Sequence, residues 1–343
     1  MTTTFDSLAL LDQDMAACNL EGFWRLGREM TLRIPHTRVQ AHLWRWRDIY
    51  DSLMRAGELV TLDDSERRTV RLINPGLPHR HCTTNTLQLS FQYIKPGEFA
   101  RAHRHSIAAV RFIIQGCGAY TTVNGQQCVM EEGDFIVTPQ MAWHDHANPT
   151  DQPIIWLDAL DAPLIQLLEQ IIFENYELPT QPITYTSEQI GLLYGSVRPM
   201  AELDTAYYHY RWRDVYPVLQ TMVQRNYGLH HFDGYVLEYR NPVSGGPTLP
   251  TMQCALHLFK PGQKTDCHRH TSTTIYHVFR GSGSTVIENM RFDWETGDSF
   301  VVPLWHAHYH LNRSSIEDAI LFSLSDAPVL RALNLYHEAP CTT

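Results

Sequence analysis

The sequence has no uninterrupted apolar run of the ~18 residues that a membrane-spanning helix needs. It also lacks the basic and then apolar pattern of a secretory leader after Met1, so we expect a cytoplasmic protein. Charged residues make up only 19% of the chain, and its net charge of -10 disfavours nucleic acids and anionic membranes as partners. Hydrophobic residues make up 43%, which provides for sizeable cores, and 343 residues are enough for two domains.

No Cys-x-x-Cys motif occurs, and the seven cysteines are scattered and odd in number: Cys18, Cys82, Cys117, Cys128, Cys254, Cys267 and Cys341. This distribution is typical of reduced thiols in a cytosolic protein rather than of a disulfide framework. Histidine is the unusually frequent residue, with 19 copies, and many of them cluster.

The chain contains one pattern twice. Residues 87–105 align with residues 252–270 without a gap, and both segments carry Lys-Pro-Gly and His-Arg-His at an offset of 165 (268 minus 103). After a one-residue slip, Gly-Asp, Pro and His recur in the same order, and Asp-Ala-Pro follows in both copies. Such internal self-similarity predicts two copies of one domain.

Each copy consists of short runs with high β-propensity between Gly, Pro and Asn, and the Asn124-Gly125 pair is typical of a type I′ hairpin. Regularly spaced short strands predict a sandwich or barrel, whereas helical periodicity falls outside these runs, for example at residues 8–30 and 43–56. We therefore expect four parts: a mainly helical extension with an entry strand (1–78), a catalytic barrel (79–176), a connector (177–245) and a second barrel (246–343).

The histidines of each copy have the spacing of a metal site. In His-x-His on a strand, both imidazoles lie on one face because side chains alternate with period two. In the first copy these are His103 and His105, and His144 from a later strand supplies a third nitrogen. The second copy offers a possible second metal site at His268, His270 and His308. Neutral imidazoles suit Fe, Zn, Cu and Ni, so the ligand type does not select the metal.

These motifs resemble the gentisate 1,2-dioxygenase family of bicupins. The resemblance covers the chain from about residue 20 to the end, and its densest part comprises Pro96-Gly97, residues 103–106, Gly116-x-Gly118, Gly133-Asp134 and residues 143–146. It implies an all-β fold of two double-stranded β-helix (jelly-roll) barrels in tandem. It further implies Fe(II) on His103, His105 and His144 with no carboxylate ligand, and a homotetramer. The implied reaction uses O2 to cleave the ring of an ortho-hydroxybenzoate between its carboxyl-bearing and hydroxyl-bearing carbons.

Four polar residues should point into the first barrel beside the metal: Gln92, Arg111, His146 and Asp158. In the resembled family, residues at these positions bind the aromatic acid, and a guanidinium fork suits a carboxylate. The alternative is an internal ion pair between Arg111 and Asp158, and Arg67 or Arg68 is a further candidate contact for the acid. The second copy has His257, Tyr276, His310 and Ser323 at the aligned positions, so we expect chemistry in barrel one only.

The motifs leave the substrate open. Gentisate is the first expectation, and salicylate, a 5-substituted salicylate such as a nitrosalicylate, or 1-hydroxy-2-naphthoate are alternatives. Gln88 and Thr69 should lie near the pocket, but the sequence does not reveal their roles. A non-catalytic bicupin that binds a small acid or stores a metal, and a cupin isomerase or Ni/Zn enzyme, remain as other classes.

Overall fold

The computed structural model describes residues 2–27, 30–61, 65, 67–193 and 208–341. The chain forms two units, Met1–His36 and Thr37–Thr343. In the first unit, helix α1 (Thr2–Ala17) is followed by the short helix α2 (Phe23–Leu26). Asp12 joins the two helices, because Trp24 Nε1 donates to it at 3.1 Å and Arg25 Nε at 2.7 Å. None of the helices in the described residues is long and apolar enough to cross a membrane.

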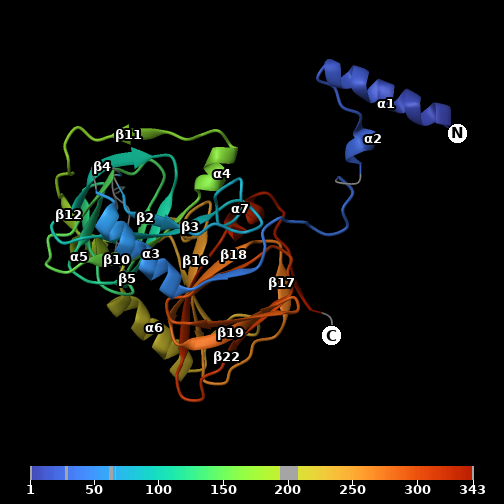
Figure 1. Ribbon diagram of the computed structural model, residues 1–343. Helices are drawn as coiled ribbons and strands as arrows, with labels where there is room; N and C mark the ends of the chain where they lie inside the picture. Colours follow the sequence, from blue (N-terminus) through green and yellow to red (C-terminus); the bar gives the residue numbers. More distant parts are fainter. Residues whose placement is uncertain (1, 28–29, 62–64, 66, 194–207, 342–343) are drawn as a thin grey trace. The chain divides into compact units, whose positions relative to one another are not determined.

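The second unit contains two β-barrels, drawn in cyan to green and in orange to red in Figure 1. One sheet of the first barrel has the order β13-β8-β5-β10-β3-β2, and the other has the order β11-β4-β9-β6-β7-β12. The strands are β2 (Thr69–Arg71), β3 (Gln88–Ile94), β4 (Phe99–His105), β5 (Ala109–Gln115), β6 (Tyr120–Val123), β7 (Gln126–Val129), β8 (Phe135–Thr138), β9 (His144–Ala147), β10 (Ile154–Leu160), β11 (Phe173–Asn175), β12 (Tyr185–Thr186) and β13 (His209–Tyr210).

The second barrel repeats this plan, with sheets of order β1-β21-β18-β23-β16-β15-β14 and β20-β19-β22-β17-β24. Its strands are β1 (His42–Trp44), β14 (Leu229–His230), β15 (Gly234–Tyr239), β16 (Gln253–Phe259), β17 (His268–His270), β18 (Thr274–Arg280), β19 (Ser282–Ile287), β20 (Met290–Glu295), β21 (Ser299–Val302), β22 (His308–Asn312), β23 (Ala319–Ser325) and β24 (Glu338–Pro340). The helices of this unit are α3 (Trp46–Leu59), α4 (Ala162–Leu167), α5 (Ser187–Leu193), α6 (Trp212–Gln224) and α7 (Ala327–Ala332).

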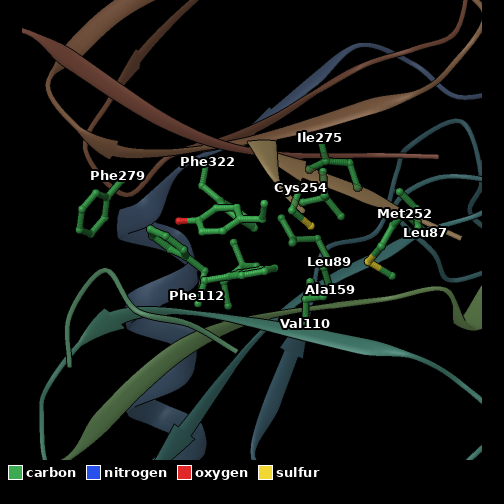
Figure 2. Close-up of a cluster of buried hydrophobic side chains, with 14 of the residues drawn as sticks. Leu87, Leu89, Val110, Phe112, Ala159, Met252, Cys254, Ile275, Phe279 and Phe322 are labelled. Atoms are coloured by element: carbon green, nitrogen blue, oxygen red, sulfur yellow. The ribbon is translucent and has the colours of Figure 1, made fainter. Parts of the chain in front are cut away.

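The barrels share one apolar core (Figure 2). Alternate side chains of β3, β5 and β10 enter it from the first barrel, and side chains of β16, β18 and β23 enter from the second. At its centre, Phe112 stacks on Phe322 with ring centroids 4.6 Å apart. The other faces of the same strands line the barrel interiors, so the alternation of each strand separates the shared core from the two metal-site candidates.

The strand that opens each copy is exchanged between the barrels. Strand β1 precedes the first barrel but pairs with β21 of the second, and β13 precedes the second barrel but pairs with β8 of the first. The helix that follows each strand belongs to the same repeat, since Arg-Trp-Arg-Asp occurs at residues 45–48 and again at 211–214. We call the segments 42–59 and 209–224 the exchanged arms.

The Gly-Asp motif of each copy anchors the incoming arm. The backbone N–H of Trp212 donates to Asp134 Oδ1 at 2.7 Å, and that of Trp46 donates to Asp298 Oδ1 at 2.8 Å. The preceding glycine has φ of +86° or +91°, and a Cβ there would lie less than 3 Å from the indole of the arm. Only glycine therefore allows the indole to pack this closely.

The structure differs from the sequence-based expectation in two places. Part of the segment 177–245, predicted as a connector, supplies β13 to the first barrel and β14 and β15 to the second, so it contributes to the sheets of both barrels. The expectation that all cysteines are reduced is wrong, because Cys267 and Cys341 form a disulfide, although the other five are free. The bridge joins residues 74 positions apart, because Cys267 directly precedes β17 and Cys341 directly follows β24, a proximity that the spacing of cysteines alone does not reveal.

The shared core should determine stability. Replacing the fully buried Phe322 by alanine leaves a cavity at the contact with Phe112, so Phe322→Ala should lower the free energy of unfolding by about 3–5 kcal/mol. Ile316, which is 83% exposed, provides the control, and Ile316→Ala should change the same quantity by less than about 0.5 kcal/mol. Urea titration followed by tryptophan fluorescence measures both, and equal effects would contradict a shared core.

Candidate metal centre

Three buried imidazoles meet inside the first barrel. His103 and His105 lie on β4, and His144 lies on the neighbouring β9 directly opposite His103. Ring centroids are 5.5 Å apart for His103 and His105, 4.3 Å for His103 and His144, and 4.8 Å for His105 and His144. One nitrogen of each ring lies within 4.8 Å of the other two, as binding of a single ion requires. The structure thus brings together the three residues that the sequence predicts as ligands.

Hydrogen bonds fix the tautomer of each ring. Each Nδ1 lies against a backbone carbonyl two positions away: Arg101 O at 2.7 Å, Ile107 O at 2.6 Å and Ala142 O at 2.9 Å. A carbonyl can only accept, so each Nδ1 carries the proton and each Nε2 keeps a lone pair. The Nε2 of His144 is buried and has no hydrogen-bond partner among the described residues. Three Nε2 lone pairs that converge inside a barrel, one of them without any partner, are a donor set for a metal ion.

Burial keeps these rings neutral. Burial, together with the positive charge of Arg67, lowers the pKa of His103 to about 3 and that of His105 to about 4. Burial also lowers the pKa of His144 well below its ordinary value, and the neighbouring His103 adds to this effect. Metal ligation requires the deprotonated imidazole, so the site is ready to bind a cation at neutral pH.

Two of the expected polar residues form a buried ion pair. Arg111 on β5 and Asp158 on β10 are directly opposed, with Arg111 Nε 3.2 Å from Asp158 Oδ1. Arg111 Nη1 also donates to Thr138 Oγ1 at 2.6 Å, and Trp156 Nε1 donates to Asp158 Oδ2 at 2.9 Å. Burial raises the pKa of Asp158, and the charge of Arg111 opposes that rise. The ion pair considered from sequence is therefore present. It lies close enough to the triad that the charge of Arg111 lowers the pKa of all three histidines.

The other two expected residues also line this barrel. His146 lies two residues beyond His144 on β9, and its Nδ1 is 2.8 Å from Thr121 Oγ1. Its Nε2 is buried and has no partner among the described residues. Gln92 is buried on β3 opposite Thr69, whose hydroxyl is also buried and without a described partner. The barrel wall therefore presents hydrogen-bonding groups that its own residues do not satisfy.

Arg67 and Arg68 have different roles in the structure, a difference that the sequence does not reveal. The Arg67 guanidinium donates to His103 Nε2, so it reaches the metal position itself. Arg68 is instead buried in an ion pair with Glu98 and donates to Val60 O. Gln88 is also part of the framework, because its amide donates to Leu89 O at 2.6 Å.

The second barrel repeats the triad but surrounds it with different side chains. His268, His270 and His308 form a second buried group of potential ligands. The position of the Arg111–Asp158 pair is taken by Tyr276 and Ser323, which are likewise directly opposed. His257 Nε2 is 2.8 Å from Ser323 Oγ, and His310 Nδ1 is 2.9 Å from Thr285 Oγ1. The strand pairing thus supports the repeat alignment residue by residue.

Comparisons with known proteins agree with this architecture. The family model described as "Cupin domain" matches residues 90–160 and 255–324. The chain is 40% identical to the 5-aminosalicylate 1,2-dioxygenase of Comamonas sp, over 96% of this chain and 90% of that protein. It is 34% identical to gentisate 1,2-dioxygenase 1 of Aquipseudomonas alcaligenes, over 94% and 93% of the two chains. The crystal structure of salicylate 1,2-dioxygenase from Pseudoaminobacter salicylatoxidans with gentisate superposes with a TM-score of 0.89 at 28% identity, covering 98% of this chain and 94% of that one.

The resemblance inferred from the motifs and the predicted fold class are both confirmed by these comparisons. The sequence offers Arg67 and Arg68 equally as contacts for the acid, because it does not reveal which of the two adjacent arginines faces the barrel interior. The exchanged arms carry a signal in the sequence, the repeated Arg-Trp-Arg-Asp, which lies outside the aligned segments of the two barrels.

The neutral triad should make the metal-stripped protein sensitive to acid. Below pH 6.5 the unfolded chain protonates His103, whereas the folded chain leaves this ring neutral down to about pH 3. The unfolded state then binds more protons, so stability falls as pH decreases, by up to about 1.4 kcal/mol per pH unit for this histidine. His103→Gln should flatten the dependence between pH 6 and pH 4.5 in urea titrations of chelator-treated protein. An unchanged slope would show that His103 titrates alike in both states.

Proposed function

The chain belongs to the gentisate 1,2-dioxygenase family of bicupin ring-cleaving dioxygenases, and from this we propose that its first barrel binds Fe(II) on His103, His105 and His144 and cleaves gentisate. The ring opens between the carbon that bears the carboxylate and the carbon that bears the adjacent hydroxyl, and both atoms of O2 enter the product. The observation that carries this proposal is the meeting of three neutral imidazoles with two guanidinium groups in one barrel.

The metal's charge is not cancelled by its ligands. All three are neutral, and no carboxylate joins the group of potential ligands in the described first barrel. Bound iron would supply the transfer of electrons between the aromatic acid and O2, because protein side chains cannot perform this chemistry alone. The protein's own contribution is to bind and orient the acid and to manage its protons.

Two arginines are suited to the substrate carboxylate. Arg67 and Arg111 both act on His103, since the charge of each lowers the pKa of that ring. Arg67 already donates to the nitrogen that would hold the metal, so with a metal present its guanidinium is placed to contact an anion on that metal. Asp158 holds Arg111 in place from the opposite strand. This charge arrangement selects anionic ligands over neutral phenols.

His146 and Gln92 supply the remaining polar contacts. The buried Nε2 of His146 has no described partner and can accept a hydrogen bond from the substrate's ortho hydroxyl, because burial lowers the pKa of this ring well below its ordinary value and keeps it neutral. The Gln92 amide can donate to the carboxylate or phenolate. Gln92, Arg111, His146 and Asp158 thus act as the substrate-binding and catalytic set.

A polar substituent on the ring would find a partner in Thr69. The hydroxyl of this residue is buried without a described partner, on the strand that pairs with Gln92. This favours gentisate, which carries a second hydroxyl, or an amino-substituted acid such as the substrate named for the Comamonas relative, over salicylate or 1-hydroxy-2-naphthoate, which carry no such substituent. An unpaired buried hydroxyl discriminates because leaving it unsatisfied costs about 1–3 kcal/mol.

We also propose that the enzyme is a cytoplasmic homotetramer. Five of the seven cysteines are free, as in proteins of a reducing compartment, and the bridge between Cys267 and Cys341 is the exception. The N-terminal unit exposes apolar side chains such as Leu20, Phe23 and Trp24, which a subunit contact would cover. Size-exclusion chromatography with light scattering measures the mass of the assembly.

Anaerobic loading with Fe(II), followed by O2 uptake, tests the activity. Gentisate should be consumed with one O2 per molecule, faster than salicylate, 5-nitrosalicylate and 1-hydroxy-2-naphthoate. His144→Ala should lose both the uptake and the barrel-one iron while staying folded, because the shared apolar core and not the metal holds the barrels together. Full turnover by His144→Ala with iron bound would falsify the proposed centre.

The role of Arg67 is separable from metal binding. Arg67→Ala should weaken the affinity for gentisate roughly tenfold to a hundredfold, since a hydrogen bond to a charged group contributes about 1.5–3 kcal/mol. Iron content should stay at the wild-type level. Arg101 lies nearby with an exposed side chain, so Arg101→Ala is the matched control and should leave both quantities unchanged. Anaerobic titration with gentisate measures the affinity, and equal values for both variants would remove Arg67 from the substrate site.

A further inference from the structure

The second triad has the geometry of the first. Ring centroids lie 5.3 Å apart for His268 and His270, 4.3 Å for His268 and His308, and 5.0 Å for His270 and His308. The corresponding separations in the first barrel are 5.5, 4.3 and 4.8 Å. A cation that fits one set of nitrogens therefore fits the other.

The tautomers agree as well. His270 Nδ1 is 2.9 Å from Ser272 O, and His308 Nδ1 is 3.0 Å from His306 O, so both rings are protonated at Nδ1. The Nε2 atoms of His268 and His308 are buried and have no partner among the described residues. Two buried acceptors left unsatisfied beside each other are costly unless a ligand completes them.

One residue distinguishes this triad from the first. Glu338 on β24 replaces Phe173 on β11, since the two pair with His270 and His105 in the same register. Phe173 stacks on His103, with ring centroids 5.1 Å apart. Glu338 instead places Oε1 2.8 Å from His268 Nδ1, where it accepts a hydrogen bond from the ring N–H. A carboxylate behind a ligating imidazole orients it and makes its free nitrogen a better donor to a metal.

The cavity in front of the second triad does not have the positive charge that would bind an acid. A cavity of about 560 Å³ opens there, lined by His268, His270, Tyr276, Asp233 and Glu338 among others. Two arginines also line it, but Arg240 pairs with Glu238 and Arg331 lies over the Tyr336 ring. Asp233 and Glu338 bring negative charge close to the triad, whereas the first barrel brings Arg67 and Arg111.

We propose that the second barrel holds a divalent first-row transition-metal ion on His268, His270 and His308, with Glu338 as the carboxylate that orients His268. Water from the cavity completes the coordination, because an anionic ligand would meet Asp233 and Glu338. Three imidazoles plus water, with one imidazole bonded to a carboxylate, is a donor set that suits Zn(II) and Co(II). This site is independent of the proposed activity of the first barrel.

The chain end is part of this site. Strand β24 pairs with β17, and the disulfide between Cys267 and Cys341 ties the two strands together beside Glu338. The pairing of β24 with β17 and the disulfide therefore hold the carboxylate in position.

Metal stoichiometry tests the proposal on the full-length protein. After saturation with Co(II) and removal of the excess, elemental analysis should give two ions per chain for the wild type and one each for His144→Ala and His308→Ala. One ion in the wild type and in His308→Ala alike, with none in His144→Ala, would overturn it. The visible absorption of bound Co(II) gives an independent count of the sites.

Glu338→Gln tests the carboxylate without removing a ligand. In competition with a chelator, this variant should hold the barrel-two ion roughly tenfold to a hundredfold more weakly, with barrel one unchanged. Glu338→Phe, which installs the residue of the first barrel, should behave alike. Exposed Glu317 is the control, and Glu317→Gln should match the wild type. Wild-type affinity in both Glu338 variants would overturn the role of Glu338.

Discussion

The period of two along each strand is the constraint on which this structure depends. On β3, β5 and β10, one set of alternate side chains packs against the other barrel, through residues such as Leu89, Phe112 and Leu157. The intervening set, which includes Gln92, Arg111 and Asp158, faces the interior. A shift of register by one residue would place the charged pair in the apolar core and the apolar side chains at the metal. Stability and chemistry are therefore fixed by the same pairing.

The two barrels place the same arrangement of histidines in two different charge environments. The histidines keep their positions and their separations, since these depend on strand geometry that both copies share. What differs is the charge around them: the first barrel has an arginine ion pair, whereas the second has a tyrosine and a serine at those positions. The centre proposed for ring cleavage and the site proposed for a second cation thus differ in the side chains around the same arrangement of histidines.

The sequence predicts those parts of the structure that depend on local periodicity. His-x-His and the repeated Gly-Asp and Pro motifs identify both triads, and the aligned positions identify Arg111 and Asp158 as interior residues. Glu338 could not be found in this way, because its role follows from the pairing of a short final strand with β17. Arg67 and Arg68 are neighbours in sequence, and only the folded chain shows that one contacts His103 and the other Glu98. Long-range pairing, not composition, decides such roles.

The exchanged arms have a consequence for synthesis on the ribosome. The hydrogen bond between Arg45 and Asp298 joins residues 253 positions apart, so strand β1 has no sheet to join until most of the chain has left the exit tunnel. The first barrel likewise lacks the edge strand β13 until the start of the second copy has emerged. Neither barrel can finish as an independent nascent domain, and the chain matures late and as a whole. A gene cut between the two copies would leave each half with an open sheet edge and an arm without a partner.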